Sequence, residues 1–145
     1  MAAIAPGDIP VLKAYEDGSC VILTHIRDDA NTSLTPSLVS TGGIVYTLTQ
    51  LINGPGVAGT SVVGHTAVAL NPPSSYIETS VVTTKGWDTN EDASGWNFRH
   101  SINIGTSPAF AESGLYEYML VVTPNNGSQP CKFVTYVNVT PVAGS

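Results

Sequence analysis

Three histidines are the side chains best suited to metal or acid–base chemistry, and their spacing supports neither. His25, His65 and His100 fall in separate apolar segments, and none has a second histidine or a cysteine at metal-ligand spacing. A zinc site needs three or four converging ligands. His100 alternates with apolar residues, which favours a hydrogen-bonded core or strand-edge residue over a base or a ligand. The sequence therefore indicates no metal site built on histidine.

One loop gathers acidic and amide side chains. Asp88, Asn90, Glu91 and Asp92 carry the oxygen atoms that calcium prefers, but their spacing does not match an EF-hand. A solvated acidic loop is the default interpretation, and calcium binding stays an alternative. Trp87 stands at the start of this loop, where an exposed aromatic residue would be a candidate for partner recognition. Its alternative role is that of a packed loop anchor.

Motifs for covalent chemistry and phosphate binding are also missing. Residues 105–109 read Gly-Thr-Ser-Pro-Ala, which is not the Gly-x-Ser-x-Gly elbow, and no strand-to-helix unit exists to carry one. The Gly-Pro-Gly of residues 54–56 precedes no helix and so forms no phosphate cradle. Scattered carboxylates leave only a glycosidase pair open. We expect a protein that is not an enzyme, with no catalytic residues, no cofactor and no metal.

Composition narrows the class of partner. Charged residues make up 11% of the 145 residues, and five Lys and Arg against eleven Asp and Glu give a net charge of −6. Nucleic-acid binding needs clustered basic side chains, so neither DNA nor RNA is an expected partner. No apolar run approaches the length that spans a bilayer. The first eight residues lack the basic and apolar regions of a signal peptide, so the sequence predicts neither export nor a membrane partner.

Two cysteines, Cys20 and Cys131, fall in apolar segments with strand character. Without export, such residues are usually reduced and buried as small hydrophobic side chains. A disulfide between them would join the first and last confident strands and would stabilise the fold through a long closed loop. Reduced thiols are the favoured interpretation, and the disulfide stays open.

Alternation of apolar and polar residues, interrupted by Gly, Pro, Asn and Ser, predicts an all-β chain without helices. Residues 1–10 form an N-terminal arm, 11–140 a single sandwich domain of about seven to nine strands, and 141–145 a short tail. The first two strands are expected to form a hairpin through an Asp-Gly turn at 16–19. The expected strands cover residues 11–15, 20–27, 44–52, 61–70, 76–84, 96–104, 115–122 and 131–139.

The clearest alternation runs from residue 96 to residue 104. The side chains expected on its core face are Trp96, Phe98, His100, Ile102 and Ile104, and those expected on its wet face are Asn97, Arg99, Ser101 and Asn103. This pattern is typical of a strand with one buried face.

The last two strands form the strongest hairpin signal, because an Asn-Gly turn joins two runs rich in β-branched and aromatic residues. The first of these strands is apolar on both faces. Leu115, Met119 and Val121 alternate with apolar residues on the opposite face of the strand. A strand with one solvated face should instead carry polar residues on that face. We expect these three residues to be covered by another segment of the chain or by another subunit, and they are candidate interaction residues.

The stretch Glu112-Ser113-Gly114-Leu115-Tyr116 followed by this hairpin resembles the closing strands of immunoglobulin-like (Ig-like) sandwiches. The resemblance implies an Ig-like antiparallel β-sandwich in which Tyr116 is the corner tyrosine. Tyr118 stands where antibody domains carry their second cysteine, so the antibody-type disulfide is excluded. Trp96 is expected in the core. Ig-like sandwiches usually have a core tryptophan on an early strand. The early strands here contain none, and Tyr46 is the nearest substitute.

Fold class, charge and the doubly apolar strand together favour a structural role. The leading expectation is a bacteriophage virion protein, made in the host cytoplasm: a capsid decoration (cement) or tail-associated domain that forms a homo-oligomer and binds a major capsid or other virion protein. The alternative is a cell-surface adhesion or carbohydrate-binding Ig-like module, which would require export. A third possibility, an assembly adaptor, would require an open sheet edge that accepts a strand.

Overall fold

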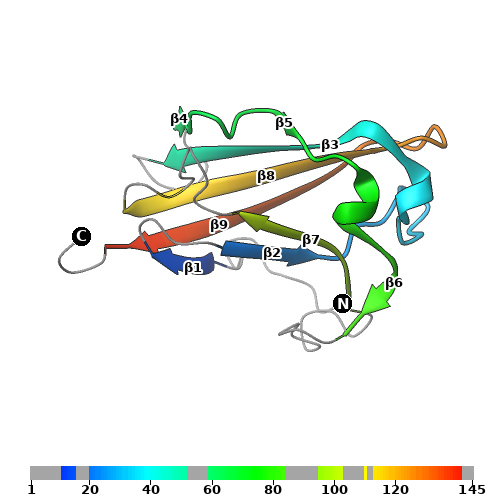
Figure 1. Cartoon of the computed structure of the whole chain (residues 1–145), viewed down its shortest axis with the longest axis horizontal. Helices are drawn as coiled ribbons and strands as arrows, with labels where there is room; N and C mark the ends of the chain where they lie inside the picture. The colour runs from blue at the N-terminus through cyan, green and yellow to red at the C-terminus, as the bar shows by residue number, and fades with distance from the viewer. Residues whose placement is uncertain are drawn as a thin grey trace.

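The computed structural model describes residues 11–15, 20–51, 59–83, 95–102, 110 and 113–141. Figure 1 shows strands lying along the long axis of the molecule in two layers. The strands are β1 (Val11–Tyr15), β2 (Cys20–Thr24), β3 (Val39–Leu51), β4 (Thr60–Ser61), β5 (Val68–Ala69), β6 (Ile77–Val82), β7 (Trp96–Ile102), β8 (Gly114–Pro124) and β9 (Cys131–Thr140). Two 3-10 turns, η1 (Pro36–Leu38) and η2 (Pro73–Ser75), precede β3 and β6.

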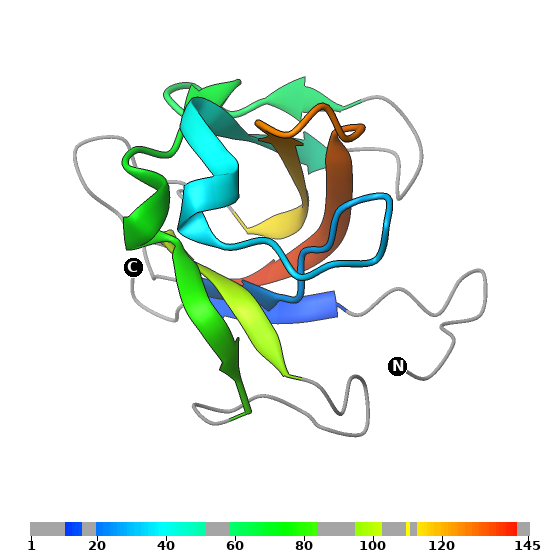
Figure 2. The same cartoon turned by 90° about the vertical axis from the view of Figure 1, so that its right-hand side faces the viewer.

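The nine described strands form two sheets that face each other (Figure 2). The larger sheet has the order β1-β9-β8-β3-β4, and β5 also pairs with β3. The smaller sheet has the order β2-β7-β6. All pairs are antiparallel except β1 with β9, which are parallel. The prediction of an all-β sandwich is therefore confirmed.

Strand connectivity gives the sandwich its Ig-like character. In an Ig domain the strands B, E and D share one sheet, and C, F and G share the other. Here β2, β7 and β6 take the first set of places and β3, β8 and β9 the second, in the same chain order. The first strand differs from the constant-type arrangement, because β1 pairs with β9 and not with β2.

The predicted opening hairpin is wrong. β1 lies beside β9 in the larger sheet, whereas β2 pairs with β7 in the smaller one. In sequence, two short apolar strands separated by a turn signal are compatible both with a hairpin and with a crossover between sheets. Only the sheet edges that are available in the folded protein decide between the two. The predicted turn at residues 16–19 lies outside the described residues.

The predicted closing hairpin is confirmed. β8 and β9 pair continuously from Gly114 with Val139 to Val122 with Cys131. Gly127 has a φ of +86°, the left-handed conformation that glycine adopts without strain, and this explains the Asn-Gly signal in the turn. The inward side chains of β8 are buried and line the space between the sheets: Tyr116, Tyr118, Leu120 and Val122.

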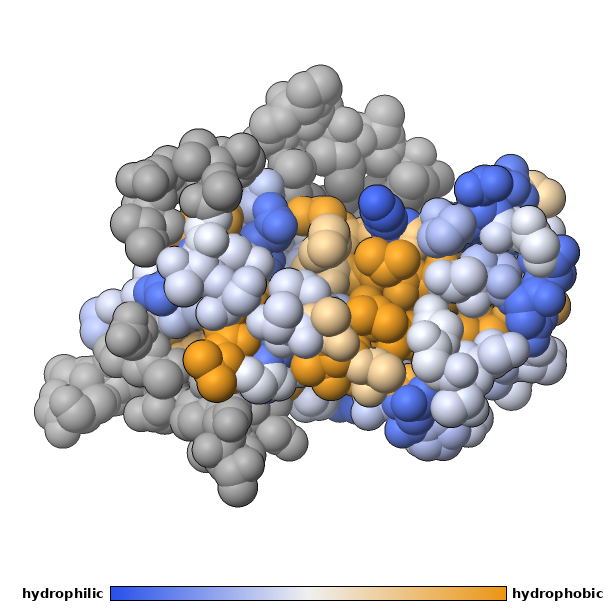
Figure 3. Space-filling view, turned by 90° about the horizontal axis from the view of Figure 1, so that it is seen from above, coloured by the Kyte–Doolittle hydropathy of each residue, from blue (hydrophilic) through white to orange (hydrophobic). Residues whose placement is uncertain are grey.

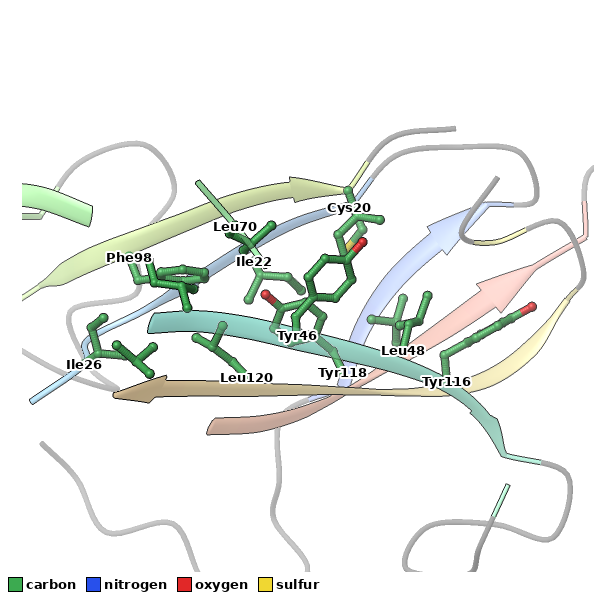
Figure 4. Packing of buried hydrophobic residues seen from close by; sticks show 14 of the residues in the cluster. Cys20, Ile22, Ile26, Tyr46, Leu48, Leu70, Phe98, Tyr116, Tyr118 and Leu120 are labelled. Carbon is green, nitrogen blue, oxygen red and sulfur yellow. The ribbon is translucent and has the colours of Figure 1, made fainter. Parts of the chain in front are cut away.

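The core lies between the two sheets and contains most of the residues that alternation placed there (Figure 4). Trp96, Phe98, His100 and Ile102 are buried as expected, whereas Ile104 lies outside the described residues. The prediction that Asn97 lies on the solvent-exposed face is wrong, because its side chain is only 1% exposed. The β7 strand is therefore buried on both faces at this position.

Asn97 is buried because its amide replaces missing backbone partners. Its Oδ1 accepts a hydrogen bond from the backbone N–H of Ile26 (2.7 Å). Its Nδ2 donates to the carbonyl oxygens of Ile26 and Leu34, both at 2.9 Å. A side-chain amide that pairs with buried backbone in this way removes the penalty of unsatisfied polar groups. Asn97 thus fixes the segment between β2 and β3 to the smaller sheet.

The observed strands differ most from the expected ranges at β2, at β3 and over residues 61–70. β2 ends at Thr24, three residues before the predicted end, and β3 begins at Val39, five residues before the predicted start. The predicted strand over 61–70 is present only as the short β4 and β5, which both pair with the same edge of β3. No α-helix of membrane-spanning length and apolarity occurs in the described part of the chain.

The two cysteines lie in different sheets and are both free thiols. Cys20 begins β2 and pairs with Ile102, whereas Cys131 begins β9 and pairs with Val122. The Cys131 Sγ donates to the Val122 carbonyl oxygen at 3.4 Å. Burial raises the pKa of the Cys20 thiol to about 11, so this thiol is neutral and a poor nucleophile at neutral pH.

Candidate functional site

The largest group of chemistry-bearing side chains in the described structure is a cluster of tyrosines and histidines between the sheets. Tyr46 of β3 stacks on Tyr118 of β8 with ring centroids 5.7 Å apart, and Figure 4 shows both side chains directed between the sheets. His100 of β7 meets Tyr46 edge-to-face at 4.7 Å. His65, in the β4–β5 connection, and Tyr76, which follows η2, complete the cluster.

Two hydrogen bonds hold this Tyr–His cluster together. The Tyr46 hydroxyl lies 2.6 Å from Nδ1 of His65, and the Tyr118 hydroxyl lies 3.0 Å from Nδ1 of His100. Together with the ring contacts they link β3, β7 and β8 across the two sheets. The prediction that His100 is a hydrogen-bonded core residue is confirmed, since it is 7% exposed and bonded to Tyr118.

Burial keeps Tyr46, His100 and Tyr118 of this cluster uncharged at neutral pH. Burial, with a smaller contribution from the nearby His65, lowers the pKa of His100 to about 4. Burial also raises the pKa of Tyr118, with smaller contributions from Tyr46, Cys20 and Tyr76. Burial, followed by Tyr76, raises the pKa of Tyr46. A neutral imidazole against a neutral phenol supplies neither a ready base nor a nucleophile, so the cluster is suited to packing.

We expect Tyr46→Phe to lower the free energy of unfolding by about 1 kcal/mol. The change removes the hydrogen bond to half-buried His65 and keeps the ring that stacks on Tyr118. Urea unfolding at pH 7 measures the effect. Tyr76→Phe is the matched control, because the Tyr76 hydroxyl makes no hydrogen bond with another described residue and its ring contact with His100 would remain. A loss above about 3 kcal/mol for Tyr46→Phe would mean that the hydroxyl does more than this single bond.

A serine–histidine pair occurs outside the core but has the wrong proton arrangement for catalysis. His25 Nε2 lies 2.6 Å from Ser33 Oγ, and the Arg27 guanidinium donates to His25 Nδ1 at 2.9 Å. Arginine has no acceptor, so Nδ1 accepts and the neutral ring carries its proton on Nε2. That proton is donated to Ser33. A catalytic histidine must instead accept the serine proton, with a carboxylate orienting its other nitrogen.

The carboxylates of Asp28 and Asp29 accept hydrogen bonds from backbone N–H groups in loops and turns. Asp28 Oδ1 accepts from the backbone N–H groups of Ala30 (3.0 Å) and Thr32 (2.8 Å). Asp29 Oδ2 accepts from the N–H of Gln129 at 3.3 Å, which joins the β2–β3 connection to the β8–β9 turn. Among the described residues no group of three or more His, Cys, Asp or Glu could hold a metal ion.

The residues predicted to be structural are all buried. Tyr46, Trp96 and Tyr116 are 5%, 0% and 2% exposed. Tyr116 lies near the start of β8, where a corner tyrosine belongs, and packs edge-to-face on Phe110 at 5.3 Å. Its corner hydrogen bond to the backbone stays a prediction. Trp87 and the proposed calcium loop of residues 88–92 lie outside the described residues.

The predicted interaction residues lie together on what we call the outward face. This face comprises the outward side chains of β3, β8 and β9: Val45, Thr47, Leu115, Glu117, Met119, Val121, Lys132, Val134 and Tyr136. Leu115, Met119 and Val121 are half-buried there, Val134 is 38% exposed, and Tyr136 is buried with 8% exposed. Every described strand belongs to one of the two sheets, so no described strand covers this face.

Apolar residues continue from this face around the β3 edge. Figure 3 looks down on the edge formed by β3, β4 and β5, where apolar residues gather near the middle and hydrophilic ones toward the end with the β8–β9 turn. Val45 connects the two regions, because it pairs with Ala69 on one side and Val121 on the other. Val63 between β4 and β5 is 86% exposed.

Two functional features escaped the sequence analysis. In the sequence, Asn97 is only an amide within a clearly predicted strand, and nothing indicates its hydrogen bond to Ile26. The contact of His65 with Tyr46 depends on the path of the β4–β5 connection, which the sequence does not show. The charged pair Glu117 and Lys132 lies on the outward face, four residues apart in the β8–β9 register. Only the pairing of the strands shows that these charges share one surface.

Comparison with known proteins adds little to this geometry. No protein-family model and no curated protein matches the chain. Among solved structures, the chain is similar to one described as "Tim-1", with 10% sequence identity, coverage of 92% of this chain and 93% of that chain, and a TM-score of 0.34. A TM-score this low carries no argument about relationship or function. The Ig-like class therefore rests on strand connectivity alone.

Proposed function

We propose that the chain is a non-enzymatic structural protein of a bacteriophage virion, a capsid decoration or tail-associated protein that acts through contacts with neighbouring subunits. The observation that carries the proposal is the outward face. In an antiparallel sheet with one solvated side, outward positions are normally polar. Here Val45, Met119, Val121 and Val134 adjoin across three strands, as expected for a surface that binds another protein.

The chemistry of the described residues supports this class. The interior Tyr–His cluster is internally hydrogen-bonded, with His100 and Tyr118 kept uncharged by burial. His25 and Ser33 have the wrong proton arrangement for a nucleophile and its base. A shell component needs a rigid body and a contact surface. The two-sheet sandwich supplies the first and the outward face the second.

Protein composition of purified particles tests the proposal. We expect phage particles from the source of this chain, banded by density gradient, to contain it in many copies per particle, as measured by quantitative mass spectrometry. Particles grown without the protein should regain heat stability when the purified chain is added back. Its absence from banded particles would overturn the proposal, whatever the protein does in isolation.

A substitution on the outward face links particle binding to this surface. We expect Val121→Lys to reduce occupancy on particles about tenfold or more, because a charge would have to be buried near the centre of the contact. Thr79→Lys, on an exposed position of β6, is the matched control and should bind normally. Equal occupancy for the two variants would show that particles bind another surface.

A further inference from the structure

We infer that the free edge of β2 pairs with the same edge of a second copy of this chain, so that the two smaller sheets join into one antiparallel sheet. In the constant-type Ig arrangement the first strand lies beside the second. Here β1 pairs with β9 instead, and β2 ends the sheet order β2-β7-β6. This edge belongs to the smaller sheet and the outward face to the larger one, so the inference goes beyond the proposed function and does not depend on it.

β2 lacks the features that protect the other described sheet edges from pairing. β4 and β5 cover the edge of β3, and between them the N–H and carbonyl groups of Leu48 bond to His65 and Val62. β6 is irregular, because its residues 77 to 82 span only residues 96 to 98 of β7, and β1 contains a lysine; both features disfavour edge pairing. β2 reads Cys-Val-Ile-Leu-Thr, with no charge, glycine or proline, and pairs with β7 in unbroken register. It is therefore the described edge best suited to accept another strand.

One hydrogen bond of β7 shows which backbone groups of β2 point to the free edge. The N–H of Arg99 donates to the carbonyl oxygen of Tyr76 at 2.8 Å, so the backbone groups of Arg99 face β6 and not β2. Leu23 is the residue of β2 paired with Arg99. Because successive residues of a strand bond to opposite neighbours, Leu23 and Val21 direct their N–H and carbonyl groups away from β7. No described strand pairs with these four groups, and Val21 is 40% exposed.

These open groups are complementary to themselves under a two-fold rotation. Two antiparallel strands are related by an axis perpendicular to their sheet, midway between directly opposed residues. An axis that sets Ile22 opposite Ile22 of the second copy also sets Val21 opposite Leu23 of the second copy, and Leu23 opposite Val21. Each open N–H then meets an open carbonyl, and every such group of Val21 and Leu23 is used in both copies. β2 overlaps its symmetry mate over its whole length in this register.

The side chains of β2 agree with this register. Val21 and Leu23 of the two copies become two apolar cross-strand pairs, which stabilise a sheet. β2 contains no charged residue, so the rotation brings no like charges together. A strand of another protein could bond to one open edge. Self-pairing satisfies the open edges of both copies at once and closes the assembly as an isologous dimer, which favours a second copy as the occupant.

The short length of β2 sets the expected strength. A strand of this length spans roughly 17 Å, so the contact buries less than the roughly 800 Å² that each partner buries in a stable interface. We therefore expect a weak dimer, with a Kd on the order of 10 μM to 1 mM. Amide hydrogen exchange should show it directly. The N–H groups of Val21 and Leu23 should gain protection as the protein concentration rises, whereas that of Ile22 is protected by β7 at every concentration.

Val21→Pro tests the pairing in the purified chain, because the N–H that it removes points away from β7 and the β2–β7 ladder stays intact. Sedimentation velocity over concentrations from about 10 μM to 1 mM measures the dimer Kd. By symmetry the change removes two hydrogen bonds, so we expect the Kd to rise about thirtyfold or more. Val21→Thr is the matched control, since it keeps the N–H and the branched shape, and its Kd should stay within about threefold of the wild type. Leu23→Pro, which removes the other open N–H, is the second variant if Val21→Pro melts below the assay temperature.

Cysteine cross-linking tests the register, in a background with Cys20→Ala and Cys131→Ala. A mixture of Val21→Cys and Leu23→Cys chains should form a disulfide-linked dimer under mild oxidation, because the two positions are directly opposed. Either variant alone should stay unlinked, since its two cysteines would lie diagonally apart, beyond the reach of a disulfide.

Three results would overturn the inference: a wild type that stays monomeric at about 1 mM, a folded proline variant that dimerises as tightly as the wild type, or cross-linking of either cysteine variant alone. None of them bears on the outward face. The content of banded particles therefore decides the proposed function separately.

Discussion

Replacing Asn97 by alanine is expected to lower the free energy of unfolding by about 4 kcal/mol. The change leaves the N–H of Ile26 and the carbonyl oxygen of Leu34 without the hydrogen-bond partner that Asn97 supplies. Each buried unsatisfied group costs about 1–3 kcal/mol. The carbonyl of Ile26 is less affected, because it also accepts from the N–H of Leu34 at 3.0 Å.

Urea unfolding at pH 7 measures this loss, and Ser101→Ala is its control. Ser101 is exposed on the same strand, so its change should stay within about 0.5 kcal/mol. Asn97→Asp should be at least as damaging as alanine, since a carboxylate would face the carbonyl oxygens of Ile26 and Leu34 and could donate to neither when ionised. A cost below about 1 kcal/mol for Asn97→Ala would show that water replaces the amide.

Acid is expected to weaken the fold through His100. Its pKa is about 4 in the folded protein and 6.5 in the unfolded chain. Between these values the unfolded chain binds more protons, so stability is fully present above about pH 6.5 and falls as the pH drops toward 4. The difference corresponds to about 3 kcal/mol. Below pH 4 the contribution from His100 levels off, because both states are then protonated.

Urea midpoints measured at intervals between pH 7 and pH 4 test this dependence. His100→Gln removes the titrating group and keeps a polar side chain that can meet the Tyr118 hydroxyl. The variant should be less stable than the wild type at pH 7 but should lose about 3 kcal/mol less on acidification. The same slope in both proteins would assign the acid sensitivity to other groups, such as carboxylates.

The local sequence pattern predicted a strand and its pairing correctly where the paired strands are also adjacent in the sequence. The β8–β9 hairpin follows from its Asn-Gly turn and from two apolar runs, and its register agrees with that turn. β7 was located by alternation at Trp96, Phe98 and Ile102, which are all buried. Alternation failed at Asn97, because a hydrogen-bonding side chain can be buried when distant backbone groups need it.

The sequence alone did not predict which strands pair when they are distant in the chain. β1 and β2 looked like partners, yet one joined β9 and the other β7. Strand pairing depends on backbone hydrogen bonds that every residue type offers, so side-chain pattern marks a strand without naming its neighbour. The Tyr–His cluster has the same origin, because its members come from β3, β7, β8 and the segments after β4 and η2.

The doubly apolar β8 strand shows both sides of this division. Its residue types alone predicted that Leu115, Met119 and Val121 would form a surface in need of a partner, because apolar side chains disfavour water wherever they lie. Sequence also determined the all-β class through its period of two. Only the tertiary structure decided that Val45, Val134, Glu117 and Lys132 join that surface, since a shared face requires the register of three strands.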